Sequence, residues 1–354
     1  MGRTLKLRDL IGVIKDKASI SKATLLSKPN TLPLHLALLR ITTHSISSPL
    51  DDHNISNLLT LGNASRATAS SVIAALMDRL HRTTDSSVAL KCLIIIHHIV
   101  KRGPFILQDQ LSIFPTTGGY NYLKLSSFKD TATSATWALS AWVRFHARYL
   151  ETVLSCSRNL GYFVCSSSCN MERDKLEEKI SSFLNVFLVQ ELDSLVGLVE
   201  ELCKLPYDFI IEGNKLMYEI MVLLNNDYLS IINEVVVRLA ELKTRLSLLS
   251  FGESVELMCG FKRLEDCKEK LFDLFSVRKP SIEMLWSLID ELKDEIGELK
   301  VYDEDGGRLG LLTLGGKEKA SESARFGGRV DRRFDSVQFS SARFDMNEHY
   351  LMII

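Results

Sequence analysis

The segment from Val88 to Val100 reads VALKCLIIIHHIV and is apolar on nearly every side when it is wound into a helix. Thr84 or Asp85, just before it, can cap the first turn, because a short polar side chain accepts hydrogen bonds from the unpaired backbone N–H groups there. A helix without a polar face must be surrounded by other elements. We therefore expect this segment to lie at the centre of a fold built from several helices.

Apolar residues at helical spacing continue over most of the first 300 residues. Stripes with a period of three or four residues begin at Leu7, Ala69 and Leu176. Further helices are expected over residues 214–224, 228–249, 256–275 and 281–299. Short breaks rich in proline, glycine or serine separate these segments. Many helices of modest length joined by short turns predict an all-α fold, and they favour an α-solenoid over a bundle.

Composition limits the function. The chain has 354 residues, 46% of them apolar, which is enough for a substantial core. A net charge of −1 excludes a protein-wide basic field, so nucleic acid is not an expected partner and an anion must be met by a local patch. Seven scattered cysteines are typical of reduced thiols in a cytoplasmic protein. No uninterrupted apolar run reaches the roughly 20 residues needed to span a bilayer, so any membrane contact is expected to be peripheral.

A second distinctive segment follows the apolar helix. Residues 128–151 read FKDTATSATWALSAWVRFHARYLE, with Trp137 and Trp142 on one long helix. The two segments together resemble the ENTH/ANTH superfamily, specifically the plant clathrin-assembly adaptors. The signature of that family is a VALKxLIxIH helix followed by WxxSAWVRxxAxYLE. The resemblance covers residues 8–151 by sequence, and residues 176–299 by helical pattern and length only.

The resemblance implies an ANTH-type solenoid that functions as an adaptor in endocytosis or vesicle budding. The implied location is cytoplasmic and peripheral on membranes, at clathrin-coated pits and vesicles and at the Golgi apparatus. The implied partners are a phosphoinositide membrane surface, the clathrin heavy chain, the appendages of adaptor complexes and SNARE helices. The corresponding division is a basic amphipathic first helix (1–28), an ENTH-like half (29–164), a C-terminal helical half (165–300) and a flexible tail (301–354).

The first helix has the pattern of an interfacial membrane helix. Residues 1–22 carry six basic and two acidic residues, a local excess of +4. An apolar stripe of such a helix enters the acyl boundary of a bilayer while its cations meet anionic headgroups. The expected cations are Lys15, Lys17 and Lys22, and the stripe consists of Leu7, Leu10, Ile11 and Ile14. An amphipathic helix can equally pack its stripe on its own protein, so the pattern leaves both arrangements open.

The phosphoinositide motif of the family is altered here. That motif is a lysine, nine residues, a lysine, one residue, a lysine and a histidine. In RITTHSISSPLDDH, Arg40 stands at the first position and His53 at the last, whereas Leu50 and Asp52 replace the other two lysines. The charge at the three lysine positions falls from +3 to 0, and Asp52 repels phosphate. Arg40 and His53 are candidate lipid-binding residues. The alternative is a soluble helical scaffold that binds partner peptides without direct lipid recognition.

The composition changes after Val301, where glycine, serine and mixed charge predict a disordered tail. Most of a clathrin-binding box is present there, with Gly315 in place of the usual acid. The tail also repeats an Arg-Phe unit, and an aromatic ring in a polar tail is available to a pocket of a partner. The candidate partner residues are Leu311, Leu312, Leu314, Phe326, Phe334 and Phe344.

Motifs for catalysis are incomplete. His97 and His98 are adjacent and point about 100° apart on a helix, whereas a metal pair needs a spacing of four. We expect one buried and one partly exposed histidine. Asp273-Leu274-Phe275 matches an adaptor-appendage signal, but it falls in a helical pattern and is expected to be core. No catalytic residue, metal or cofactor is expected, and the chain is not expected to be an enzyme.

Overall fold

The computed structural model describes residues 2–29, 31–45, 50–114, 123–166, 173–206, 213–275 and 280–303. These residues form twelve α-helices and a short 3-10 helix at Leu246–Leu248, with no strand among them. The helices of the N-terminal part are α1 (Gly2–Leu26), α2 (Leu32–Ile41), α3 (Asp52–Gly62), α4 (Arg66–Arg82), α5 (Ser86–Arg102), α6 (Phe105–Ser112) and α7 (Ser134–Leu160). The remainder are α8 (Arg173–Ser181), α9 (Asn185–Leu202), α10 (Lys215–Thr244), α11 (Phe251–Leu274) and α12 (Pro280–Asp303). The predicted all-α class is confirmed.

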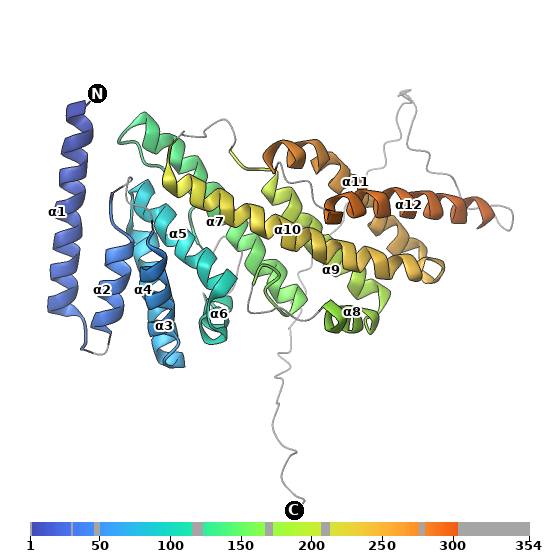
Figure 1. The fold of residues 1–354 in the computed structure, drawn as a ribbon, viewed down its shortest axis with the longest axis horizontal. Helices are drawn as coiled ribbons and strands as arrows, with labels where there is room; N and C mark the ends of the chain where they lie inside the picture. The colour runs from blue at the N-terminus through green and yellow to red at the C-terminus, as the bar shows by residue number, and fades with distance from the viewer. Residues whose placement is uncertain are drawn as a thin grey trace, which may run out of the picture. The chain divides into compact units, whose positions relative to one another are not determined.

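Most of the helices that pack on one another are adjacent or next but one in the sequence, as in a solenoid (Figure 1). α1 packs on α2, α2 on α3 and α4, and α5 on α7. The row continues from α7 through α9 to α11, while α10 contacts α5, α9 and α12. One compact unit, Met1–Gly306, contains all of these helices. Because α10 packs against helices from both sides of residue 165, the division there stays a prediction.

The apolar helix predicted at Val88–Val100 is α5, and it is buried as expected. Every residue from Ser86 to His97 is buried. Asp85 caps the helix by accepting hydrogen bonds from two backbone N–H groups. Asp130 lies below the same end and accepts from the backbone N–H and the hydroxyl of Ser86, at 3.0 and 2.9 Å. Burial acts to raise the pKa of Asp130, but these hydrogen bonds and one from Ala132 outweigh burial and hold the pKa below its ordinary value.

Two predicted helix boundaries are wrong. Residues 214–224 and 228–249 were each expected to form a helix, but α10 is continuous through Asn225, Asn226 and Asp227. The polar run resembles a break, yet Asp227 is fully buried with polar partners of its own. Conversely, the single stripe expected from Leu176 onward is divided between α8 and α9.

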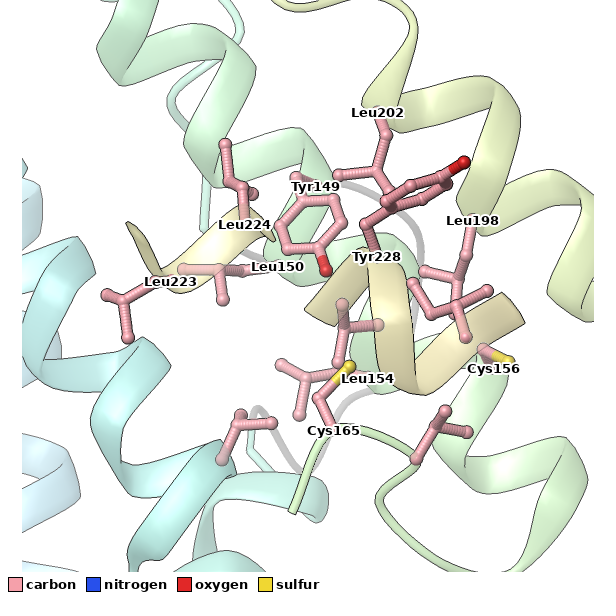
Figure 2. Close-up of a cluster of buried hydrophobic side chains, with 14 of the residues drawn as sticks. Tyr149, Leu150, Leu154, Cys156, Cys165, Leu198, Leu202, Leu223, Leu224 and Tyr228 are labelled. Atoms are coloured by element: carbon pink, nitrogen blue, oxygen red, sulfur yellow. The ribbon is translucent and has the colours of Figure 1, made fainter. Parts of the chain in front are cut away.

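The core continues from α7 into the C-terminal helices. Figure 2 shows Tyr149 and Leu154 of α7 close to Leu198 of α9 and to Leu224 and Tyr228 of α10. Among the described helices, α10 is the one whose length and apolar composition would suffice to cross a membrane. About half of its most apolar stretch is buried inside the fold. Packing against neighbouring helices accounts for its apolar character.

Candidate functional site

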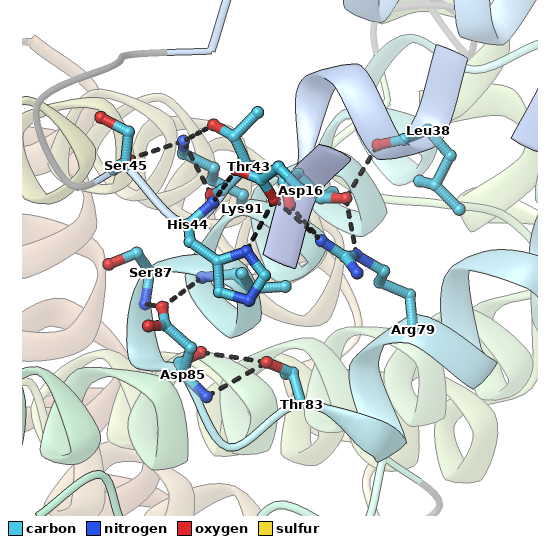
Figure 3. Close-up of polar contacts among 12 residues, drawn as sticks. Asp16, Leu38, Thr43, His44, Ser45, Arg79, Thr83, Asp85, Ser87 and Lys91 are labelled. Carbon is cyan, nitrogen blue, oxygen red and sulfur yellow. Dashed lines mark hydrogen bonds and ion pairs between the residues drawn. The ribbon is translucent and has the colours of Figure 1, made fainter. Parts of the chain in front are cut away.

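The turn that follows α2 is a polar junction between four helices (Figure 3). Arg79 of α4 donates to the hydroxyl and the carbonyl of Thr42, at 3.0 and 2.6 Å. Lys91 of α5 donates from Nζ to Oγ1 of Thr43 at 2.9 Å, to its carbonyl at 3.2 Å, and to the carbonyl of Ser45 at 2.8 Å. The turn is therefore fixed to the core helices by two basic side chains.

Lys91 is the lysine of the VALKxLIxIH signature, and its side chain is completely buried. Burial disfavours the ammonium form and lowers the pKa of Lys91 to about 8. Its three donors meet three oxygens of Thr43 and Ser45. We conclude that this lysine positions the turn from inside the fold and does not face solvent.

The turn after α2 also binds α1. The backbone N–H of His44 donates to Oδ2 of Asp16 at 3.1 Å, and the ring Nδ1 of His44 lies 2.6 Å from Oδ1. Arg79 approaches the same carboxylate at 3.9 Å. Gly12 packs directly on His44, since a Cβ added at Gly12 would lie 3.0 Å from the Cβ of His44. The side of α1 that carries Gly12 and Asp16 therefore packs against the fold.

The apolar stripe of α1 faces away from the fold. Leu10 is 56% exposed, Ile11 44% and Ile14 59%. The alternative in which the stripe packs on its own protein is therefore wrong for these three residues. The side chain of Leu7 lies outside the described residues. α1 thus presents its apolar residues to solvent and its small and acidic residues to the protein.

The three predicted lysines of α1 are all exposed, but they do not lie together. Lys15 and Lys22 line an open groove of about 830 Å³ between α1, α2 and the end of α4, and Lys17 lies outside it. Three basic residues of this groove, Lys28, Arg79 and Arg82, were not identified from the sequence. The groove forms where segments about 60 residues apart approach each other, so no local pattern could have indicated it.

The altered phosphoinositide motif has a structural basis. Leu50 is buried against the core, where a lysine could not remain solvated. Asp52 is exposed in the first turn of α3 and forms an ion pair with Arg102. The hydrogen bond from Arg102 holds the pKa of Asp52 below its ordinary value. Arg40, at the end of α2, and His53, at the start of α3, are both exposed. The four motif positions therefore hold two exposed basic residues, Arg40 and His53, together with the buried Leu50 and the carboxylate of Asp52.

A buried polar network joins α5, α7 and α10, and sequence analysis missed it. The carboxylate of Asp227 lies 2.6 Å from Nε2 of His97 and accepts from Nζ of Lys101 at 2.7 Å and from the hydroxyl of Tyr149 at 2.8 Å. Burial acts to raise the pKa of Asp227, but the charges and hydrogen bonds of His97 and Lys101 outweigh it and lower the pKa to about 2. The ring Nδ1 of His97 lies 3.1 Å from Nε2 of His146.

The remaining motifs have plain structural roles. His97 is buried and His98 is partly exposed, as expected. Phe275 of the Asp273-Leu274-Phe275 sequence is buried and stacks on Tyr228, with ring centroids 4.7 Å apart, so the core interpretation is confirmed. Within the described ranges, no group of three or more metal-ligating side chains is arranged to hold a metal ion. The tail candidates lie outside the described residues: Leu311, Leu312, Leu314, Phe326, Phe334 and Phe344.

The comparisons with known proteins decide the family. The ANTH domain model matches residues 34–284. The chain belongs to the ANTH domain family. The predicted resemblance and the predicted ANTH-type solenoid are both confirmed. The match begins inside α2, so α1 precedes the part of the ANTH domain that the model covers.

Named relatives of this ANTH protein come from Arabidopsis thaliana. The "Putative clathrin assembly protein At4g40080" is 47% identical over 352 residues, covering 97% of this chain and 96% of the relative. The "Putative clathrin assembly protein At5g10410" is 33% identical over 297 residues, covering 81% and 85%. The "Clathrin coat assembly protein AP180" is 33% identical over 156 residues, which cover 43% of this chain but 24% of that longer protein.

Proposed function

We propose that this protein is a clathrin-assembly adaptor whose α1 docks on a phosphoinositide-bearing membrane. The observation that carries the proposal is the orientation of α1. Its apolar residues Leu10 and Ile14 point away from the fold, and exposed lysines lie beside them. An apolar stripe next to cations is what a helix needs to lie in the interface of an anionic bilayer.

The electrostatic part of this binding is modest for each residue. A lysine near an anionic membrane surface contributes about 1 kcal/mol, and the contribution is screened within a Debye length of about 8 Å at physiological salt. Lys15, Lys17 and Lys22 together support salt-sensitive attachment, to which Arg40 and His53 add weakly. Entry of the apolar stripe into the acyl boundary supplies a component that salt does not screen.

Recruitment of the coat is the second part of the proposal. The relatives carry names that describe them as clathrin assembly proteins. By analogy, this chain binds the clathrin heavy chain through Leu311, Leu312 and Leu314, and adaptor appendages through Phe326, Phe334 and Phe344. SNARE helices are further proposed partners. Several weak motifs on one chain reinforce one another by effective concentration. The proposed locations are clathrin-coated pits and vesicles and the Golgi apparatus.

Co-sedimentation with liposomes tests the membrane part. The full chain is mixed with neutral liposomes, with phosphatidylserine liposomes and with liposomes that also carry phosphatidylinositol 4,5-bisphosphate, each at low and high salt. We expect salt-sensitive pelleting that increases with the phosphoinositide. The double variant Lys15→Glu/Lys17→Glu should remain soluble. The matched control is Lys262→Glu/Lys270→Glu, which changes the net charge equally at exposed positions of α11 and should pellet normally.

A soluble helical scaffold remains the second candidate, and one observation favours it. Leu50 is buried and Asp52 is paired with Arg102, so the family motif cannot present its lysines here. The scaffold binds partner peptides and never engages lipid. Absence of pelleting on every anionic liposome would reject the adaptor proposal in favour of the scaffold.

A further inference from the structure

Two cysteine residues meet where α9 packs on α11. Cys203 directly follows the last turn of α9, and Cys267 lies in α11, 64 residues further along the chain. The Sγ atom of Cys203 lies 3.9 Å from the backbone carbonyl oxygen of Cys267 and donates to it. A thiol is a weak donor, so this contact contributes little to stability. Its importance is that it places one thiol directly beside the residue that carries another.

The packing of the two helices extends this contact over two further turns. Val196 lies seven residues before Cys203, and Gly260 lies seven residues before Cys267. A Cβ added at Gly260 would lie 4.0 Å from Cγ2 of Val196. Both pairs are separated by 64 residues, as expected for two parallel helices in one register. Because residues seven apart lie on nearly the same face of a helix, the cysteines belong to the continuous contact between α9 and α11.

An arginine fixes the same register. Arg263, one turn before Cys267 on α11, donates from Nε to Glu200 of α9 at 2.9 Å and pairs with the other oxygen of that carboxylate at 2.7 Å. It also forms an ion pair with Asp193, which lies seven residues before Glu200. A bidentate arginine pair is geometrically specific. The two helices are therefore held along their axes in the position that keeps the cysteines together.

The two thiols also interact with each other. The hydrogen bond from Cys203 lowers the pKa of Cys267 below its ordinary value and outweighs burial, which acts to raise it. The same hydrogen bond raises the pKa of Cys203, and burial acts in the same direction. Since the thiolate is the reactive form of a cysteine, Cys267 is the nucleophile of the pair and Cys203 is the thiol that stays protonated beside it.

The buried cysteines elsewhere in the described part of the chain do not meet these conditions. Burial raises the pKa of Cys92 and of Cys156 to about 12, and it raises the pKa of Cys165 well above its ordinary value. Thiols of this kind are inert. Cys203 and Cys267 are each 7% exposed, whereas Cys92 is completely buried. The pair between α9 and α11 therefore combines a neighbouring thiol, a stabilised thiolate and some contact with solvent.

We propose that Cys203 and Cys267 are a redox modification site, at which a peroxide oxidises the two thiols to a disulfide between α9 and α11. The thiolate of Cys267 attacks one oxygen of hydrogen peroxide. An S–O bond forms, the O–O bond breaks, and the departing hydroxide takes up the proton that the thiol released. The sulfur of Cys203 then attacks the sulfur of the resulting sulfenic acid. The S–S bond forms as the S–O bond breaks, and the hydroxyl group leaves as water with the proton of Cys203. Two thiols and one hydrogen peroxide give one disulfide and two water molecules.

The disulfide would act on the C-terminal part of the fold. It would close a loop that contains α10, the helix that contacts α5, α9 and α12. A cross-link constrains the unfolded chain, and the constraint grows with the length of the loop. The oxidised protein should therefore keep α9, α10 and α11 together under conditions that open them in the reduced protein. This inference does not depend on the proposed adaptor function.

Mass spectrometry of the full chain tests the site. The reduced protein is treated with hydrogen peroxide at neutral pH, its remaining thiols are blocked with iodoacetamide, and it is digested with trypsin. Trypsin cleaves after Lys204 and Arg263, so Cys203 and Cys267 fall on different peptides. We expect a cross-link between these two peptides that disappears with dithiothreitol. The thermal midpoint of the oxidised protein should lie at least about 5 °C above that of the reduced protein.

Two variants and a matched control give the cross-link its meaning. Cys267→Ala should lack the cross-link, leave Cys203 open to alkylation, and show no rise in thermal midpoint with peroxide. Cys203→Ala removes the hydrogen-bond donor, so iodoacetamide should alkylate Cys267 several-fold more slowly than in the parent at neutral pH. A purely structural cysteine pair would not show this change in rate. The control is Cys259→Ala, which removes an exposed cysteine of the same helix and should retain the cross-link.

The outcomes that overturn the inference are distinct. If both thiols remain free after treatment with peroxide, or if Cys267 becomes a sulfinic acid without any cross-link, the pair is not a disulfide site. Equal cross-linking of Cys259 to either residue also rejects it, because this would reflect unselective oxidation. Circular dichroism checks that each variant is folded, and Cys267→Ser replaces Cys267→Ala if the latter is not.

Discussion

Asp16 and His44 join the first helix to the turn after the second. One carboxylate oxygen of Asp16 lies 2.6 Å from the ring Nδ1 of His44, and the other accepts from its backbone N–H at 3.1 Å. The partners are 28 residues apart in the chain. This contact places the apolar stripe of α1 on the outside, because the small and acidic side of the helix is the side that is held.

Replacing Asp16 should free α1 without unfolding the domain. We expect Asp16→Ala to accelerate amide hydrogen exchange across α1, since a hydrogen bond to a charged group contributes about 1.5–3 kcal/mol. Exchange in α5 should stay unchanged. Hydrogen exchange with mass spectrometry makes the measurement, and Asp290→Ala on the exposed side of α12 is the control. Equal exchange in α1 of the parent and Asp16→Ala would show that other contacts hold the helix.

Asp227 should be a major determinant of stability at neutral pH. Its pKa is about 2 in the fold, whereas the ordinary pKa of an aspartate is 3.8. Removing one partner of a buried ion pair costs about 3–5 kcal/mol, so Asp227→Asn should lower the urea midpoint strongly. A lowered carboxyl pKa contributes stability that is present above pH 3.8 and lost as pH falls towards 2. The difference between parent and variant should therefore shrink over that interval, and a difference independent of pH would contradict this assignment.

The contribution of Lys91 to stability should also rise with pH, but in the alkaline range. Its pKa is about 8 in the fold, whereas the ordinary pKa of a lysine is 10.5, so the unfolded chain binds more protons between these values. Its contribution to stability therefore rises with pH from about 8 to 10.5, by up to about 3 kcal/mol. The variant Lys91→Met lacks this pH-dependent contribution to stability. The unfolding free energy of the parent relative to Lys91→Met, measured by urea titration, should increase between pH 7.5 and 10; a constant difference would be incompatible with a lowered pKa of Lys91.

Phe275 and Phe272 offer a direct comparison of core and surface. Phe275 is 3% exposed and stacks on Tyr228, whereas Phe272 is 47% exposed. Phe275→Ala should cost about 3–5 kcal/mol of stability by leaving a cavity, and Phe272→Ala much less. Thermal and urea unfolding make the comparison. If Phe275→Ala kept the stability of the parent but lost binding to an adaptor appendage, the core assignment would be wrong and the short-motif interpretation right.

Local patterns predicted the helices well and their interruptions poorly. The cap at Asp85 and the apolar run after it are contained within a few residues, so α5 was placed correctly. The polar run around Asp227 resembles a break in the sequence, because the partners of its carboxylate, His97 and Lys101, lie more than 120 residues away. The local sequence around a buried carboxylate does not differ from that around an exposed one. Only the distant residues that pair with the carboxylate distinguish the two cases.

The sequence by itself determined the all-α class, the ANTH family and the buried position of α5, because helical periodicity, caps and the two signature segments are local properties. The tertiary structure decided which side of α1 faces solvent, that Leu50 is buried and Asp52 pairs with Arg102, and that Lys15, Lys22 and Lys28 share a groove with α4. These features depend on which distant segments meet. The sequence pattern of one helix indicates which of its faces is apolar and which is polar, but not which element packs against each face.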